Sequence, residues 1–560
     1  MVAVISARAL KDMIANVGAD ANVGADRELA ILDTREEGVY AEGHLLFASS
    51  CPLSRLELLI GDLVPRQGTP LVIIDGGNVD SGGLAARAAE KLETFGYSDV
   101  AILDGGIGAW GDAGFEIFGG MNVPSKAFGE LVEARLGTPH ITADQLKIMM
   151  DRGDNMVVLD SRPVDEYKMM SIPGALNCPG SELVYRIHDI APDPDTKVVV
   201  NCAGRTRSII GAQSLINAGV PNDVVALENG TMGWHLAGYE LEHNAARLAP
   251  APSPEGLAEA RTRAKRLSAK AGVVEIDEAR FNRFRDEAAA RSLYVFDVRP
   301  DDEYMAGHLD GARPAIGVQL AQKTDSFIAC LRARVVVVDD TGVRARLAAA
   351  WLRQMGWEAY VLADGASEGM PMASGAYRPT VSSAVPSAVP GADTAPDQGQ
   401  IGTIAPRMLA VQLQRGHLHL LDLSRSLTFD KGHIPGARFA IRARLAESLN
   451  HLPAGDIVLT SEDGMLAHLA AGEVAAAGRG VKVLTSGNAA WVGENMPMER
   501  GRGNPLDPLE DEAFWRPYER ESGQEEAMEK YLAWEHGLID QIIRDGDARF
   551  NVIKFKDTRP

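Results

Sequence analysis

One sequence pattern recurs four times along this chain, at intervals that each match the length of a single domain. In each copy a short apolar run ends in an aspartate, which is followed by acidic residues and then by a Gly-His or Pro-Gly-Ala turn. The four aspartates, spaced 125 to 137 residues apart, are Asp33, Asp160, Asp297 and Asp422. Repetition at a fixed interval predicts the same structural unit built four times, with room for a separate core in each.

Within every repeat, strand patterns alternate with helix patterns. In repeat two, apolar runs at 198–200 and 224–227 flank a helix pattern at 209–218, and the other repeats show the same order. Strands and helices that alternate at this spacing predict a mostly parallel sheet with helices on both faces. The predicted fold class is therefore α/β, as four tandem domains of one kind.

Domain boundaries follow from the composition of the segments between repeats. We expect the repeats at residues 1–120, 121–249, 273–379 and 401–502, with a helical linker at 250–272, an Ala/Pro/Ser-rich linker at 380–400 and a helical C-terminal extension at 503–560. Residues 15–20 are duplicated at once as residues 21–26, which we interpret as a tolerated loop insertion.

Composition limits the setting and the partners. A formal net charge of -21 argues against nucleic-acid or anionic-membrane partners. The chain starts without a basic, apolar leader and contains no apolar run of 18 residues, so we expect a cytoplasmic protein. Its 4 cysteines form neither a disulfide framework nor a Cys/His metal pattern, which predicts reduced thiols, no zinc and no other cofactor.

Cys202 is the strongest candidate nucleophile. It opens a loop between the strand pattern at 198–201 and the helix pattern at 208–216. Successive N–H groups of such a loop point inward, and the positive end of the helix dipole adds to them, so the loop favours an anion at its centre. Arg205 and Arg207 place further positive charge beside a thiolate. We interpret the other three cysteines as small buried apolar residues.

These features together resemble the rhodanese family of sulfurtransferases, from about residue 5 to residue 500. The resemblance is carried by the Asp-x-Arg strand ends, the turn at 432–437, the loop at 202–207 and the late segments ending at Trp110 and Trp234. It implies four rhodanese-like repeats. Aligned through the loop glycine, the position of Cys202 is held by Asp75, Asp340 and Glu462 in the other repeats, so only repeat two is expected to be catalytic.

The resemblance also implies a mechanism and a set of site residues. Cys202 would take sulfane sulfur from a small donor, such as thiosulfate or a related persulfide or thiosulfonate, and pass it to cyanide or a thiol. A protein could also deliver or accept the sulfur, and the oligomeric state stays open. Arg205 and Arg207 would hold the persulfide and the anionic donor. The residues expected to form the cradle are Ala203, Gly204, Arg205, Thr206, Arg207 and Ser208.

Other interpretations remain open at this point. A cysteine phosphatase needs five residues between cysteine and arginine, but only four separate Cys202 from Arg207. A non-catalytic scaffold that senses sulfide or carries persulfide is the main alternative, and the three repeats that lack the loop cysteine could act as scaffold or docking surface. Asp160 and Arg162 are expected to form a structural ion pair. Trp234 and His235 are expected either to pack at the domain rim or to border the site.

Overall fold

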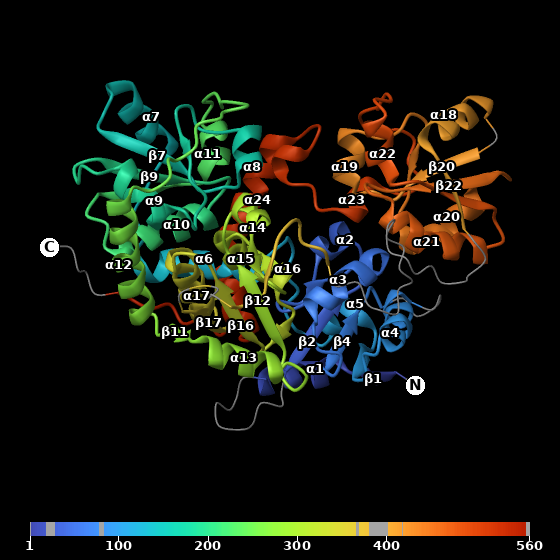
Figure 1. The fold of residues 1–560 in the computed structure, drawn as a ribbon, viewed down its shortest axis with the longest axis horizontal. Helices are drawn as coiled ribbons and strands as arrows, with labels where there is room; N and C mark the ends of the chain where they lie inside the picture. Colours follow the sequence, from blue (N-terminus) through green and yellow to red (C-terminus); the bar gives the residue numbers. More distant parts are fainter. Residues whose placement is uncertain are drawn as a thin grey trace.

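The computed structural model contains four mostly parallel sheets, one in each repeat (Figure 1). It describes residues 2–17, 28–77, 83–363, 365, 369–379, 401–416 and 418–555. The duplicated segment at 15–26 lies largely outside the described residues, and the predicted linker at 380–400 lies entirely outside them. Helices cover both faces of the sheets, so the predicted α/β class is confirmed.

Each sheet has the same strand order, with the strand that carries the motif aspartate next to the strand that leads into the loop. In spatial order, sheet one contains β1 (Ala3–Ile5), β5 (Val100–Leu103), β4 (Leu71–Ile74) and β2 (Leu29–Asp33), with β3 (Ser49–Ser50) also paired to β2. Sheet two contains β6 (His140–Ile141), β10 (Val224–Leu227), β9 (Lys197–Asn201), β7 (Met156–Asp160) and β8 (Leu176–Asn177).

Sheets three and four follow this order. Sheet three contains β11 (Val274–Ile276), β17 (Glu358–Leu362), β16 (Arg334–Val338), β12 (Leu293–Asp297) and β14 (Arg313–Pro314). Sheet four contains β19 (Gly402–Ile404), β23 (Val481–Leu484), β22 (Asp456–Thr460), β20 (Leu418–Asp422) and β21 (Arg438–Phe439). A separate antiparallel pair joins β13 (His308–Leu309) to β18 (Met372–Ala373).

The helices fall into corresponding positions in the four repeats. Repeat one has α1 (Ala7–Asn16), α2 (Glu37–Glu42), α3 (Leu56–Leu63), α4 (Leu84–Thr94) and α5 (Gly106–Asp112), followed by α6 (Val123–Leu136). Repeat two has α7 (Ala143–Arg152), α8 (Val164–Met169), α9 (Leu183–Ile190), α10 (Thr206–Ala218) and α11 (Gly230–Leu236), followed by α12 (Pro254–Lys270).

Repeat three has α13 (Glu278–Asp286), α14 (Asp301–Ala306), α15 (Gly317–Gln322), α16 (Thr324–Phe327) and α17 (Val343–Gln354). Repeat four has α18 (Pro406–Arg415), α19 (Ser426–Lys431), α20 (Leu445–Ser448), α21 (Met465–Ala476) and α22 (Gly487–Gly493). Of the helices that the structure describes, none has both the length and the apolar character needed to cross a membrane.

The repeats share backbone pairing and apolar cores. Strand β15 (Cys330–Leu331) of repeat three pairs antiparallel with β2 and so extends the sheet of repeat one. One continuous apolar cluster contains Ile73 of repeat one, Val337 of repeat three and Phe439 of repeat four. Because buried apolar surface is shared in this way, the repeats stabilise one another and hold one relative orientation.

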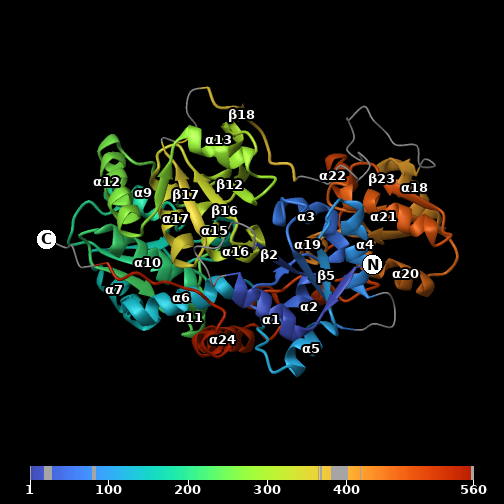
Figure 2. The same ribbon diagram turned by 90° about the horizontal axis from the view of Figure 1, so that it is seen from below.

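The C-terminal segment at 503–560, which the sequence predicts to be helical, is helical only in part. It forms α23 (Leu509–Glu512), a 3-10 turn at Pro517–Glu519 and the long helix α24 (Gln524–Asp545), with non-helical chain between them. Pro517 and Gly523 explain the interruption, since proline begins helical turns more readily than it continues them and Gly523 adopts left-handed backbone at φ 68°. Helix α24 lies against α6, as Figure 2 shows.

A buried ion pair joins repeats one and four. Arg442 donates to both carboxylate oxygens of Glu57, at 2.8 and 2.9 Å. Burial alone would raise the pKa of Glu57, but Arg442 and Lys91 hold it below its usual value. Without Arg442, the Glu57 carboxylate would keep only Lys91, at 2.7 Å, as its counterion.

We therefore predict that Arg442→Ala lowers the stability of the protein by about 1.5–3 kcal/mol, the range typical of lost hydrogen bonds to a charged group, since Lys91 remains paired with Glu57. The measurement is the thermal unfolding midpoint. Arg407→Ala is the matched control, because Arg407 pairs with Glu494 while 81% of its side chain stays exposed, and such pairs contribute little. Equal midpoints for the two variants would contradict the assigned role of Arg442.

Candidate functional site

Cys202 lies in the turn that joins β9 to α10. Val198, Val199 and Val200 of β9 are completely buried between helices, which fixes the end of this strand. Helix α10 begins four residues after the cysteine and ends at Gly219, whose left-handed backbone (φ 73°) terminates it. The Cys202 side chain is 1% exposed, and its thiol donates to the Ser208 hydroxyl over 3.6 Å.

The N–H groups of this turn are available to an anion. No described residue accepts a hydrogen bond from the N–H groups of Gly204, Arg205 or Arg207. Helix α11 holds the carbonyls of the turn. The N–H of Thr231 donates to the carbonyl of Cys202, and the N–H of Met232 donates to the carbonyl of Ala203. The carbonyls of the turn are thus fixed by hydrogen bonds while the N–H groups of Gly204, Arg205 and Arg207 have no described acceptor, as in an empty anion-binding nest.

Repeats one and three show what such a turn binds. In repeat one the Asp75 carboxylate accepts hydrogen bonds from the N–H groups of Gly77 and Ala85, at 2.8 and 3.0 Å. In repeat three the Asp339 carboxylate accepts from the N–H groups of Gly342 and Arg344, at 2.7 and 3.0 Å. In both repeats an aspartate of the protein itself fills the cradle.

The strand register corrects two predicted equivalences. In each sheet the motif aspartate pairs with the last residue of the strand that leads into the loop. The residue after this pairing partner is therefore the structural equivalent of Cys202. The equivalent residues are Cys202, Asp75, Asp339 and Ser461. The predictions of Asp340 and Glu462 are each wrong by one position, because the loop glycines Gly342 and Gly464 come one residue later than in repeats one and two.

Arg207 lies beside the thiol, as the sequence predicts. Its guanidinium donates two hydrogen bonds to Glu166 of α8, at 3.0 and 2.8 Å. Burial opposes the charge on Arg207, but Glu166 and then Cys202 interact with it electrostatically and raise its pKa. Burial by itself would raise the pKa of Glu166, but Arg207 and Arg516 hold this pKa well below its usual range. Both charges of the Arg207–Glu166 pair therefore persist at neutral pH.

Arg205 differs from the expectation. Its guanidinium turns toward α6, where it donates to both oxygens of Glu130 at 2.8 Å and also contacts Glu133. Two carboxylates already use its donors, so the side chain anchors the loop to α6 rather than holding a donor molecule. Only its backbone N–H remains part of the cradle.

The remaining loop residues contribute small polar groups. The buried Thr206 hydroxyl lines the cavity and makes no hydrogen bond to a described residue. The Ser208 hydroxyl donates to the carbonyl of Arg205 at 2.8 Å while it accepts from the Cys202 thiol. Ser208 therefore links the cysteine to the first turn of α10.

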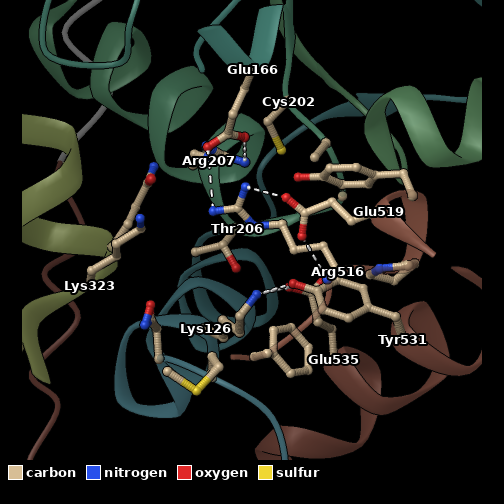
Figure 3. A pocket seen from close by; sticks show the side chains of 18 of the residues that line it. Lys126, Glu166, Cys202, Thr206, Arg207, Lys323, Arg516, Glu519, Tyr531 and Glu535 are labelled. Atoms are coloured by element: carbon tan, nitrogen blue, oxygen red, sulfur yellow. Dashed lines mark hydrogen bonds and ion pairs between the residues drawn. The ribbon is translucent and has the colours of Figure 1, made fainter. Parts of the chain in front are cut away.

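Cys202 faces a cavity of about 340 Å³ that lies between all four repeats and the C-terminal segment (Figure 3). Repeat one contributes Glu37, repeat three contributes Lys323, repeat four contributes Arg425, and the C-terminal segment contributes Arg516 and Tyr518, among others. The volume is at the lower end of the range of small-molecule sites. Repeats that lack the cysteine therefore supply walls of its cavity.

One side of the cavity carries a hydrogen-bonded group of charged and aromatic residues. Lys126 of α6 donates to Glu535 of α24 at 3.0 Å and contacts the Tyr531 hydroxyl (Figure 3). The second carboxylate oxygen of Glu535 is buried without a described partner, and the residue lies beside Gly204. Helix α24 thus closes the cavity over the loop.

Other predicted residues lie behind the site. Arg162 donates to Asp160 at 2.9 and 2.6 Å, and to the carbonyl of Met170, with both side chains completely buried. The pair therefore ties the strand end to the turn. Trp234 is buried against Tyr239, and His235 lines a different cavity, so neither borders the cavity of Cys202.

The recurring histidines are also structural. Each stacks on an aromatic ring within its own turn: His44 on Tyr40, His308 on Tyr304, and His433 on Phe429. Burial lowers the pKa of His44 to about 4, which keeps this ring neutral.

The comparisons agree with this geometry. The family model described as a rhodanese-like domain matches residues 7–113, 142–237, 281–370 and 405–494. A crystal structure of a thiosulfate sulfurtransferase from Pseudomonas aeruginosa is 44% identical, with a TM-score of 0.89, over 99% of this chain and 100% of that one. The chain therefore belongs to the rhodanese family, with four rhodanese-like domains in tandem.

Two curated relatives match shorter parts. A second thiosulfate sulfurtransferase from Pseudomonas aeruginosa is 26% identical over 219 residues, which cover 32% of this chain and 79% of that protein. An HTH-type transcriptional regulator from Mycobacterium tuberculosis is 31% identical over 111 residues, 20% of this chain. The chain spans 48% of the length of that regulator.

Close backbone packing behind the loop leads to a prediction. A Cβ on Gly230 would lie 2.3 Å from the carbonyl oxygen of Cys202, and its backbone is left-handed at φ 55°. We expect Gly230→Ala to displace the loop and reduce sulfur transfer at least about tenfold, as a small misplacement of reacting groups can. Gly108→Ala is the matched control, since a Cβ there meets no atom within 4 Å. Full activity of Gly230→Ala would show that this packing does not set the loop.

Proposed function

We propose that this rhodanese-type sulfurtransferase carries sulfane sulfur as a persulfide on Cys202. The donor is a small anion, thiosulfate or a related persulfide or thiosulfonate, and the acceptor is cyanide or a thiol. The proposal includes the loop from Ala203 to Ser208 as the cradle of the persulfide. A cytoplasmic location is part of it, supported by the four free cysteines.

One observation carries the proposal. The turns of repeats one and three each bind a carboxylate from their own aspartate, whereas the equivalent residue in repeat two is a cysteine whose cradle is left open. A persulfide on Cys202 adds one S–S bond, about 2.05 Å, to the side chain and ends in a negative charge. It therefore presents an anion to N–H groups equivalent to those that hold Asp75 and Asp339.

The proposed reaction occurs in two steps, each of which forms one bond to the transferred sulfur and breaks one S–S bond. The Cys202 thiolate attacks the outer sulfur of thiosulfate, a new S–S bond forms, and the old S–S bond breaks with its electron pair leaving on sulfite. Cyanide or a thiolate then attacks the terminal sulfur of the persulfide, and the electron pair of that S–S bond returns to Cys202. A covalent intermediate between two half-reactions predicts ping-pong kinetics.

The surrounding charges favour both steps. The positive charge of Arg207 interacts with Cys202 and stabilises its anionic forms, while Glu166 fixes the orientation of Arg207. Burial of the cysteine excludes water, which strengthens these electrostatic interactions.

We predict that wild-type protein gains the mass of one sulfur when incubated with thiosulfate and loses it to cyanide as thiocyanate. Cys202→Ser should gain nothing and lose turnover while keeping its melting temperature. Intact-protein mass spectrometry with a thiocyanate assay measures both results.

Cys178→Ala is the matched control, because Cys178 is a completely buried thiol in the same repeat and burial raises its pKa. This variant should still load one sulfur. Persulfide formation that cyanide and thiols leave intact would support the sensing or carrier alternative, and no loading from either thiosulfate or glutathione persulfide would overturn the proposed function.

A further inference from the structure

One cation in the cavity of Cys202, Lys323, has no counterion among the described residues, and a second, Arg516, has only long ion pairs. The ammonium of Lys323, at the turn between α15 and α16, makes no hydrogen bond or ion pair with any described residue. The Arg516 guanidinium approaches Glu519 only at 3.7 Å and Glu166 only at 4.0 Å. By contrast, four other cations of the cavity are each hydrogen-bonded to a carboxylate: Lys126, Arg205, Arg207 and Arg425.

Lys323 and Arg516 lie close enough to repel each other. Burial lowers the pKa of Lys323, and the charges of Arg516 and Arg207 lower it further, while Glu166 and Glu37 act in the opposite direction. Both side chains are half-buried, and two like charges in such a place favour an anion that binds between them. Among the described residues that line the cavity are six cations and four carboxylates. Carboxylates just outside the lining neutralise two of these cations, since Glu130 and Glu133 pair with Arg205 and Glu512 pairs with Arg425.

The two cations come from outside the catalytic repeat. Lys323 belongs to repeat three and Arg516 to the C-terminal segment, and Figure 3 shows both side chains projecting toward the cavity that Cys202 also faces. An anion held by them would therefore lie in the same cavity as the reacting sulfur.

We propose that Lys323 and Arg516 form an anion-binding subsite, which holds the negatively charged end of the sulfur donor while its transferable sulfur meets Cys202. The inference rests on the proposed function. The group bound is an oxyanion, either the sulfite end of thiosulfate or a carboxylate of an organic persulfide. With thiosulfate, the subsite also stabilises the charge that the departing sulfite takes with it.

Steady-state kinetics of Lys323→Met and Lys323→Arg test the subsite. Because hydrogen bonds to charged groups are strong, we expect Lys323→Met to lower kcat/KM for the donor about tenfold or more, and Lys323→Arg to restore most of it. Release of sulfur from preloaded Cys202 persulfide to cyanide should change less than about twofold, since the donor has already left. A merely structural lysine would affect both half-reactions.

The pH profile gives a second readout. Deprotonation of Lys323 at alkaline pH removes the charge that binds the donor, so the donor KM of wild type should rise as pH increases, starting below the range of an ordinary lysine. Lys323→Arg, which stays protonated, should lack this rise. Lys530→Met is the matched control, because Lys530 is an exposed lysine on α24 paired with Glu526.

The outcomes separate the two proposals. If wild type forms no persulfide, the proposed function fails. If wild type turns over but Lys323→Met keeps its kcat/KM for both thiosulfate and glutathione persulfide, the subsite is overturned. A loss confined to one donor identifies the source of the oxyanion. Arg516→Met repeats the test from another segment if Lys323→Met does not fold.

Discussion

The site depends on a turn of backbone N–H groups that must hold an anion. A strand end and a helix start direct these donors toward one point, and an unsatisfied buried N–H is costly. Repeats one and three meet the requirement with Asp75 and Asp339. Repeat two has Cys202 at the equivalent position, and its turn holds no carboxylate of its own among the described residues. One substitution at a shared position thus separates a turn that is closed by an aspartate from one that is left open, which is the basis of the proposed persulfide site.

Repeats without the cysteine still contribute to the chemistry. Their shared cores and the pairing of β15 with β2 fix their orientation around repeat two. This rigidity lets Lys323, Arg425 and Glu37 line the cavity from separate repeats. The enclosure is extended by α24, which lies against α6 and brings Tyr531 and Glu535 over the loop. The fourfold architecture therefore builds one composite pocket around Cys202.

Local sequence patterns were sufficient for most of the fold and the centre of the site. Buried valine runs and turn motifs predicted four parallel sheets, and the Cys202 loop was recognisable because strand, loop and helix are contiguous. Helical propensity was misleading for the C-terminal segment, where Pro517 and Gly523 divide the chain. Alignment through the loop glycine also gave the wrong equivalents of Cys202 in repeats three and four, because the loops differ in length by one residue. The pairing of the strands identifies the equivalent residues without depending on loop length.

By itself, the sequence determined the repeat unit, the place of Cys202 in a strand-to-helix turn and the Asp160–Arg162 pair, because each depends on residues within a few positions of one another. Only the tertiary structure decided which charges besides Arg207 lie around the thiol. Arg205 finds its carboxylates on α6, while Lys323 and Arg516 reach the cavity from more than 100 and 300 residues away in the chain. No local periodicity records such contacts, since they arise from how packed repeats bury their surfaces against one another.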